Sequence, residues 1–244
     1  MVPQAEKQHG VARAPRSASW AWWGAKSLGA CCLPLFLIIS NLLLVTNSSW
    51  LYEYGFSTYN IPAATGIAFD QLLLAAEQTR DYFNSSDEPL QVTVEKNGKP
   101  FELYRDREVR HMADVKGLLL LTERIATLTG AYLLALALLG LWFRRRTFIL
   151  DAAAVLLGGG VLTLVLMLLA ALGTFMSFDQ LFLVFHLISF TNNLWLLDPT
   201  RDYLLMMYPD GFFRDATLVI AALTLGEAAA LVILSVKILP RVRR

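Results

Sequence analysis

Four long apolar segments limit what this chain can fold into. The hydrocarbon core of a bilayer is about 30 Å thick and is crossed by about 20 residues of α-helix. Segments of that length or longer cover residues 28–46, 117–143, 147–174 and 216–239, and charged residues flank each of them. Hydrophobic residues make up 56% of the chain and charged residues only 17%, which excludes an ordinary soluble domain. We therefore predict an all-α membrane protein, with four transmembrane helices in one membrane domain, 28–239.

The distribution of lysine and arginine predicts how these helices are oriented. Basic residues are retained on the cytoplasmic side of a membrane. Here they gather in the N-terminal tail, at Arg144–Arg146 between the second and third spans, and after the fourth span. Both termini are therefore expected in the cytoplasm, with 1–27 as a disordered tail and 240–244 as a basic end. The connections 49–116 and 175–215 would then lie outside the cell.

The first outer connection has the pattern of a small folded cap. Residues 64–83 alternate apolar and polar groups with the period of an amphipathic helix. Residues 91–94 and 101–104 alternate with the period of strands, and between them stands Asn97-Gly98, a pair that tolerates the positive φ angles of a two-residue hairpin turn. We predict a cap made of one amphipathic helix and a short β-hairpin.

The second outer connection contains a further apolar stretch, residues 178–197. A fifth span there would place the basic C-terminus outside, against the charge rule. The stretch also carries polar side chains that suit an interface better than a bilayer core: Asp179, His186, Asn192 and Asn193. We therefore predict a re-entrant or interfacial helix between the third and fourth spans.

Charge and cysteine content exclude several classes of function. The chain has 21 Lys+Arg against 20 Asp+Glu, so its formal net charge of +1 gives no field that would attract nucleic acid. Cys31 and Cys32 are adjacent within an apolar run, where they can neither join distant loops nor form a CxxC pair. We expect no nucleic-acid partner and no disulfide framework.

Two histidines are the best candidates for chemistry. His111 and His186 both lie at the predicted outer membrane boundary, and imidazole, with an ordinary pKa of about 6.5, is the usual group for moving a proton near neutral pH. No GxSxG, HExxH or glycine-rich phosphate motif accompanies them. Two other readings remain open: packed interfacial histidines, or a metal site completed by Asp114 or Asp179.

Other charged and polar residues have expected roles in structure or in binding. Arg124 and Glu227 are predicted at similar depth in the membrane, and we expect them to pair because buried charges need partners. The segment 191–202 is rich in polar groups around the turn at Asp198-Pro199 and is expected to form a wall of the site. Its candidates for hydrogen bonding to an oxyanion or a lipid headgroup are Asn192, Asn193 and Arg201, whereas Trp195 fits the aromatic belt.

Four motifs resemble those of the lipoprotein intramolecular transacylase (Lit) family. They are HMxDVK at 111–116, FHxxxF at 185–190, NNLWLLDP at 192–199 and YPDGFF at 208–213. The resemblance covers about 28–239, with four spans and a large outer loop in the same order. It departs from the family pattern at Asn193, where an aspartate is expected.

The resemblance implies an enzyme of the bacterial plasma membrane whose site faces outward. Its substrates would be diacylglyceryl-modified lipoproteins, and the sn-2 acyl chain would move to the α-amino group of the lipidated cysteine. The product would be an N-acyl S-monoacylglyceryl (lyso) lipoprotein. Such a transfer within one substrate needs proton transfers and no cofactor or enzyme nucleophile.

The same resemblance implies that His111 and His186 are the catalytic residues. Lys116 or Arg201 is expected to hold the oxyanion or the headgroup. The remaining motif residues expected to support the site are Asp114, Asn192, Asn193, Trp195 and Asp198. Two alternatives stay open: a non-enzymatic membrane protein whose outer cap binds a partner or lipid, and another histidine-dependent membrane acyltransferase or hydrolase that acts on phospholipid. The sequence does not indicate an oligomeric state.

Overall fold

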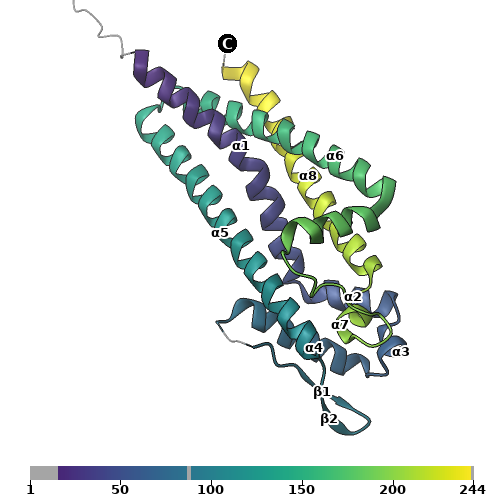
Figure 1. Ribbon diagram of the computed structural model, residues 1–244. Coiled ribbons are helices and arrows are strands. Elements are labelled where there is room, and N and C mark those ends of the chain that lie inside the picture. The colour runs from purple at the N-terminus through teal and green to yellow at the C-terminus, as the bar shows by residue number, and fades with distance from the viewer. Residues whose placement is uncertain (1–15, 87–88, 243–244) are drawn as a thin grey trace, which may run out of the picture.

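The computed structural model describes residues 16–86 and 89–242, and most of them lie in four long helices (Figure 1). Each of the four contains a segment long and apolar enough to cross a membrane. The prediction of an all-α membrane protein with four transmembrane helices is confirmed. The long helices are α1 (Arg16–Thr46), α5 (Asp106–Phe143), α6 (Phe148–Ser189) and α8 (Asp210–Val242).

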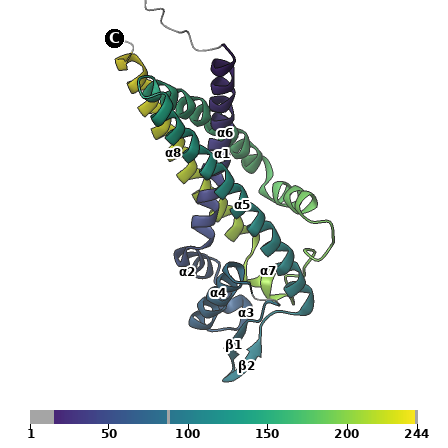
Figure 2. The same cartoon turned by 90° about the vertical axis from the view of Figure 1, so that its left-hand side faces the viewer.

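The shorter elements form a cap at one end of the bundle. In Figures 1 and 2, α1 begins and α8 ends at the other end, so the described ends of the chain lie on the same side. The order of the elements thus agrees with four spans and two long connections that meet at one end. The cap elements are α2 (Ser49–Thr58), α3 (Ile61–Thr65), α4 (Phe69–Asn84), β1 (Thr93–Lys96), β2 (Lys99–Glu102) and α7 (Tyr203–Met207).

Helix α1 lies at the centre of the bundle and packs against α5, α6 and α8. Two adjacent glycines on α6 allow the backbones to approach closely, as small residues commonly do between membrane helices. A Cβ atom on Gly159 would lie 2.7 Å from Leu33 of α1. A Cβ atom on Gly160 would lie 2.9 Å from Val232 of α8. These contacts hold α6 between its two neighbours.

A buried carboxylate joins α1 to α6 at the end of the bundle opposite the cap. Asp151 is 8% exposed and accepts hydrogen bonds from Lys26 Nζ at 2.7 Å and from Trp22 Nε1 at 3.1 Å, while Arg144 Nε lies 3.5 Å away. The predicted disordered tail is therefore wrong for residues 16–27, which belong to α1. Trp22 and Lys26 are held by Asp151, a partner far away in the sequence. Residues 1–15 lie outside the described residues.

The predicted pair of Arg124 and Glu227 does not form. Glu227 accepts a hydrogen bond from Asn41 Nδ2 at 2.8 Å, and the same amide also lies 3.1 Å from Thr224 Oγ1. No ion pair in the described part of the chain involves Arg124. The physical reason is the helix arrangement: α8 packs on α6 and α1, whereas α5 packs on α1 from another side. Similar depth along two helices did not bring their side chains together.

The β-hairpin forms around the predicted turn. Asn97 and Gly98 have φ angles of 55° and 71°, and the register pairs Lys96 with Lys99 directly beside this two-residue turn. This is the geometry that suits the right-handed twist of two strands. The strands lie two residues closer to the turn than predicted, because the pairing begins at the turn itself. The predicted amphipathic helix is also present, as α4.

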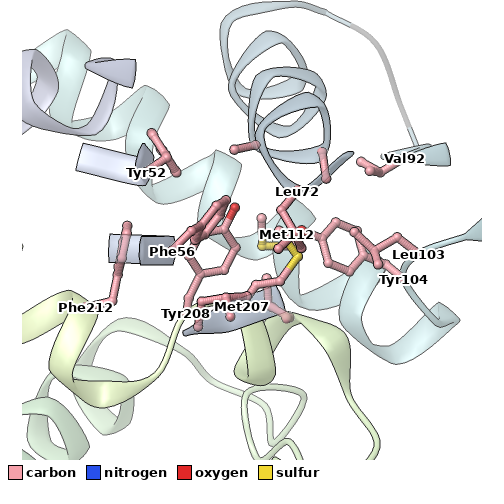
Figure 3. Close-up of a cluster of buried hydrophobic side chains, with 14 of the residues drawn as sticks. Tyr52, Phe56, Leu72, Val92, Leu103, Tyr104, Met112, Met207, Tyr208 and Phe212 are labelled. Atoms are coloured by element: carbon pink, nitrogen blue, oxygen red, sulfur yellow. Dashed lines mark hydrogen bonds between the residues drawn. The ribbon is translucent and has the colours of Figure 1, made fainter. Parts of the chain in front are cut away.

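The cap has a hydrophobic core to which both of its long connections contribute. Figure 3 shows Phe56 of α2, Leu72 of α4, Met112 of α5 and Met207 of α7 meeting there with Phe212 at the start of α8. Phe56, Leu72 and Met207 are completely buried. This burial fixes the first turns of α5 and α8 against the cap. Helices α2 and α7 were not predicted.

Helix α6 contains a break after its membrane-spanning part. Ser177 has φ −170° and ψ 106°, so the chain leaves helical geometry there and continues as a second, shorter apolar helix, Ser177–Ser189. The chain changes direction at this point (Figures 1 and 2). A helix therefore lies between the third and fourth spans as predicted, but it ends at Ser189, and residues 190–202 are irregular.

Candidate functional site

The two candidate histidines lie side by side although they come from different helices. His111 is in the second turn of α5 and His186 is near the end of the segment Ser177–Ser189. Their ring centroids are 6.3 Å apart with an interplanar angle of 30°. His111 is only 7% exposed, and His186 is partly buried. One small substrate group can therefore reach both imidazoles at once.

Aromatic rings surround the histidine pair. The Phe190 ring centroid is 5.1 Å from that of His111 and 5.6 Å from that of His186. The Phe182 ring meets His186 edge to face at 4.4 Å, and the Trp195 ring lies 5.0 Å from it. These rings displace water from the imidazoles, and a drier site strengthens electrostatic interactions with the histidines.

Hydrogen bonding assigns the proton on one ring. His186 Nδ1 lies 2.7 Å from the backbone oxygen of Phe182. A carbonyl oxygen can only accept, so Nδ1 donates, and in the neutral ring Nε2 keeps the lone pair. His111 Nδ1 is buried and has no hydrogen-bond partner within the described residues. The site thus has one imidazole of fixed tautomer and one whose buried Nδ1 has no partner among the described residues.

The histidines open onto a cavity of about 260 Å³ between α5, the end of α6, α7 and α8. Its walls are mostly leucine and aromatic side chains, which suits an acyl chain or another apolar group. Two carboxylates also line it, and no lysine or arginine does. The lining residues are His111, Asp179, Phe182, Leu183, His186, Trp195, Leu196, Leu197, Leu204, Leu205, Tyr208, Asp210 and Phe213.

Asn192 fastens the irregular segment 190–202 to α5. Its Nδ2 donates to Asp114 Oδ2 at 2.9 Å, and its Oδ1 accepts from Leu194 N at 2.9 Å. Its backbone oxygen accepts from Trp195 Nε1 at 2.9 Å. Both ends of the Asn192 amide are therefore engaged in holding Trp195 against His186. Asn192 is not among the residues that line the cavity.

Arg107 holds the same segment from the first turn of α5. Its guanidinium donates to the backbone oxygen of Asn193 at 2.5 Å and to that of Leu194 at 3.3 Å. Asn193 itself is exposed and lines no part of the cavity. Arg107 was not predicted from the sequence, because a single arginine before a span does not differ from the charged residues that flank membrane helices in general. Its position one turn before His111 was the signal that could have found it.

Exchanging the two partners tests the bond between α5 and Asn192. Asn192→Asp places a carboxylate 2.9 Å from that of Asp114, so we expect the free energy of unfolding to fall by about 1–3 kcal/mol. The double variant Asp114→Asn/Asn192→Asp restores a donor and an acceptor and should recover most of that loss. Thermal unfolding in detergent measures both. Equal stability of the single and double variants would show that this contact does not hold the segment.

Three other predicted site residues lie away from the cavity. Lys116 is 3% exposed, and its Nζ lies 4.0 Å from the centre of the Tyr82 ring, on the side of α5 that faces α4. Five residues of helix rotate a side chain by about 140°, which separates Lys116 from His111. Arg201 is exposed and pairs with Asp198 at 3.5 Å. Hydrogen bonds from the Thr200 hydroxyl and N–H hold the pKa of Asp198 below its usual value.

Glu108 is a buried residue of the site region that sequence reasoning missed. It is completely buried, three residues before His111. Its Oε2 accepts from the N–H of Arg105 at 2.9 Å, which caps α5, and its Oε1 accepts from the N–H of Leu204 at 2.7 Å, which begins α7. This carboxylate joins the helix of His111 to the cavity wall. An acidic residue in a first helical turn is common, so the pattern gave no sign of the second contact.

The described residues contain no group of three or more histidine, cysteine, aspartate or glutamate side chains placed to hold a metal ion. Asp114, one predicted third ligand, is engaged by Asn192. Asp179, the other, lines the cavity. The geometry therefore gives the two histidines no third ligand.

Comparison with known proteins agrees with this geometry. A family model described as lipoprotein intramolecular transacylase Lit matches residues 27–213. This chain belongs to the Lit family. Lit proteins are membrane acyltransferases, and the match to this Lit-family chain includes both histidines of the pair.

One relative matches part of the sequence, and solved structures of a Lit protein share the fold. An uncharacterised protein of Aquifex aeolicus is 32% identical over 129 residues, which is 53% of this chain and 54% of that protein, so the chain spans about half the length of that relative. The structure of the membrane-integral Lit from Bacillus cereus has a TM-score of 0.77 at 20% identity, covering 92% of this chain and 99% of that one. A histidine-to-alanine variant of the same protein gives 0.73 at 19% identity, with 93% and 97% covered.

Proposed function

We propose that this chain moves an acyl group within a diacylglyceryl-modified lipoprotein. The sn-2 acyl chain leaves the glycerol oxygen and joins the α-amino nitrogen of the N-terminal cysteine. One N–C bond forms, one ester C–O bond breaks, and a proton passes from the amine to the glycerol oxygen. The product is an N-acyl S-monoacylglyceryl lipoprotein. Membership of the Lit family supports the reaction class.

The pair of imidazoles 6.3 Å apart is the observation that carries this proposal. The amine and the ester belong to one molecule, so proximity comes from the substrate and no enzyme nucleophile is needed. What remains is to deprotonate the amine, stabilise the tetrahedral intermediate and protonate the leaving oxygen. Two histidines at one cavity supply these proton transfers without a cofactor. The apolar lining disfavours water as a competing nucleophile.

The hydrogen bonds suggest how the two histidines divide the work. His186 donates through Nδ1 to Phe182, so Nε2 has the lone pair to accept the proton of the amine. His111 is more deeply buried and its Nδ1 has no partner among the described residues, so it is suited to bind the ester oxygen and to pass the second proton of the attacking nitrogen to the glycerol oxygen. In this mechanism His186 takes the ammonium proton and later releases it to solvent, and His111 relays the second proton of the nitrogen, so both rings return to their starting state.

The distribution of charge supports a site on the outer side of a bacterial plasma membrane. The basic loop Arg144–Arg146 lies at the end of the bundle where α1 begins, as the contact of Arg144 with Asp151 beside Trp22 shows. The histidine pair lies at the other end, beside the cap. Basic residues stay in the cytoplasm, so the histidines face outward, where the lipidated N-termini of lipoproteins are also found.

Mass spectrometry of a lipoprotein tests the proposal. A reporter lipoprotein is expressed with the wild type, with His111→Ala, with His186→Ala, and with His9→Ala as the control histidine from the N-terminal tail. We expect the N-acyl lyso form with the wild type and His9→Ala, and the unchanged diacylglyceryl form with the other two. If membrane-inserted wild type leaves the reporter unchanged, the transacylase proposal fails. Release of free fatty acid from phospholipid would then favour a hydrolase.

A further inference from the structure

We propose that Asp179 and Asp210 bind the α-ammonium group of the substrate and so select lipoproteins with a free N-terminal amine. The inference rests on the proposed function and assigns a binding role that the histidines do not fill. Both carboxylates line the cavity that the histidines share. Neither side chain forms a hydrogen bond or an ion pair within the part of the chain that the structure describes.

Two helical turns that pack together carry these carboxylates. Asp179 comes seven residues before His186 on the same helical segment, which is about two turns and places both side chains on one face. Phe182 follows Asp179 by one turn, and Phe213 follows Asp210 by one turn. The centroids of these two phenylalanine rings are 4.9 Å apart. The contact brings together the helical turns that carry the two aspartates.

The charges around the cavity fit a cationic ligand. No lysine or arginine lines it, so the two carboxylates have no opposite charge there. A second observation points to a ligand in the same place: His111 lines the cavity, is 7% exposed, and keeps a buried Nδ1 without a partner among the described residues. An ammonium group entering an apolar cavity needs carboxylate partners, and a nearby neutral imidazole can then take its proton.

This arrangement also accounts for the release of product. The ammonium form is attracted to Asp179 and Asp210, and loses that attraction once His186 has taken its proton. The free amine then attacks the ester. The amide product carries no charge on this nitrogen, so it no longer binds the carboxylates. A lipoprotein that is already N-acylated is excluded for the same reason.

Binding of unreactive lipopeptides tests the assignment separately from turnover. The probes are two lipidated cysteine peptides whose sn-2 chain is joined by an ether, one with a free α-amine and one N-acetylated. Their affinities are measured by microscale thermophoresis in detergent for the wild type, Asp179→Asn, Asp210→Asn and the double variant. Asp81→Asn, which changes an exposed carboxylate on α4 outside the cavity, is the matched control.

We expect the wild type and Asp81→Asn to bind the free-amine probe about tenfold more tightly than the N-acetyl probe, as for a charge-assisted contact. The double variant should lose this preference while still binding the N-acetyl probe and keeping its melting temperature. Equal affinity of the wild type for both probes, or an unchanged preference in the double variant, would overturn the assignment. If the preference is found but the reporter is not acylated, only the proposed reaction fails. If the reporter is acylated without a preference, only this inference fails.

Discussion

Replacing His186 by asparagine is expected to slow formation of the N-acyl product by about 10²- to 10⁴-fold, the usual contribution of a positioned acid or base. The asparagine amide can still donate to the backbone oxygen of Phe182, which His186 Nδ1 contacts at 2.7 Å. It has no basic nitrogen in place of Nε2, so it cannot accept the proton of the amine. The variant therefore removes the base and preserves the local fold.

The measurement is the initial rate on a synthetic diacylglyceryl lipopeptide, read by mass spectrometry, beside the melting temperature. A double variant that also changes His111 to asparagine should be scarcely slower than either single variant, because the two rings act on one transfer. Leu187→Val, which keeps an apolar side chain beside His186 on the exposed face of the helix, is the matched control and should retain activity. A rate for His186→Asn within threefold of the wild type would remove His186 from the mechanism.

Replacing Glu108 by alanine is expected to lower the free energy of unfolding by about 2–5 kcal/mol, because two buried N–H groups lose their acceptor. One belongs to Arg105 at the start of α5 and the other to Leu204 at the start of α7, at 2.9 and 2.7 Å. Leu204 lines the cavity. Loss of this contact should therefore reduce activity as well as stability.

Thermal unfolding in detergent measures the stability of each variant against that of the wild type. Guanidinium chloride or sodium dodecyl sulfate is added at a concentration that keeps the unfolding reversible. Glu108→Gln keeps one acceptor oxygen and should lie between the wild type and Glu108→Ala. Glu102→Ala removes an exposed carboxylate of β2 and should change stability little. If Glu108→Ala and Glu102→Ala have the same melting temperature, the two backbone contacts do not hold α5 to α7.

The membrane helices and the hairpin could be predicted because their signals are local. An apolar run of sufficient length has few alternatives to a spanning helix, and Asn97-Gly98 specifies its own turn. Residues 16–27 and 49–58 lack such signals. Both segments are helical in the structure. Trp22 and Lys26 of the first segment bind Asp151. Phe56 of the second segment packs in the cap core. Partners distant in the sequence decide their structure.

The site residues also differ in whether a local signal in the sequence identifies them. The two histidines were identified by their chemical type, and the structure places them together. Arg107 and Glu108 were missed because their importance comes from backbone atoms of residues 193, 194 and 204, which no side-chain pattern reveals. Lys116 carries the positive charge expected of a group that holds an oxyanion, but the helix directs its side chain toward Tyr82.

The kink at Ser177 affects the energy needed for a lipid to reach the histidines. Beyond it, the outer face of the helix carries leucine, valine and isoleucine side chains, and Ile188 is 80% exposed. An acyl chain of about 16 carbons transferred to water would cost roughly 13 kcal/mol, at about 0.8 kcal/mol per CH₂. In the proposed reaction, an apolar approach of this kind would let the tail pass from hydrocarbon to Phe182 and Leu183 without meeting water. Most of that transfer cost is then never incurred.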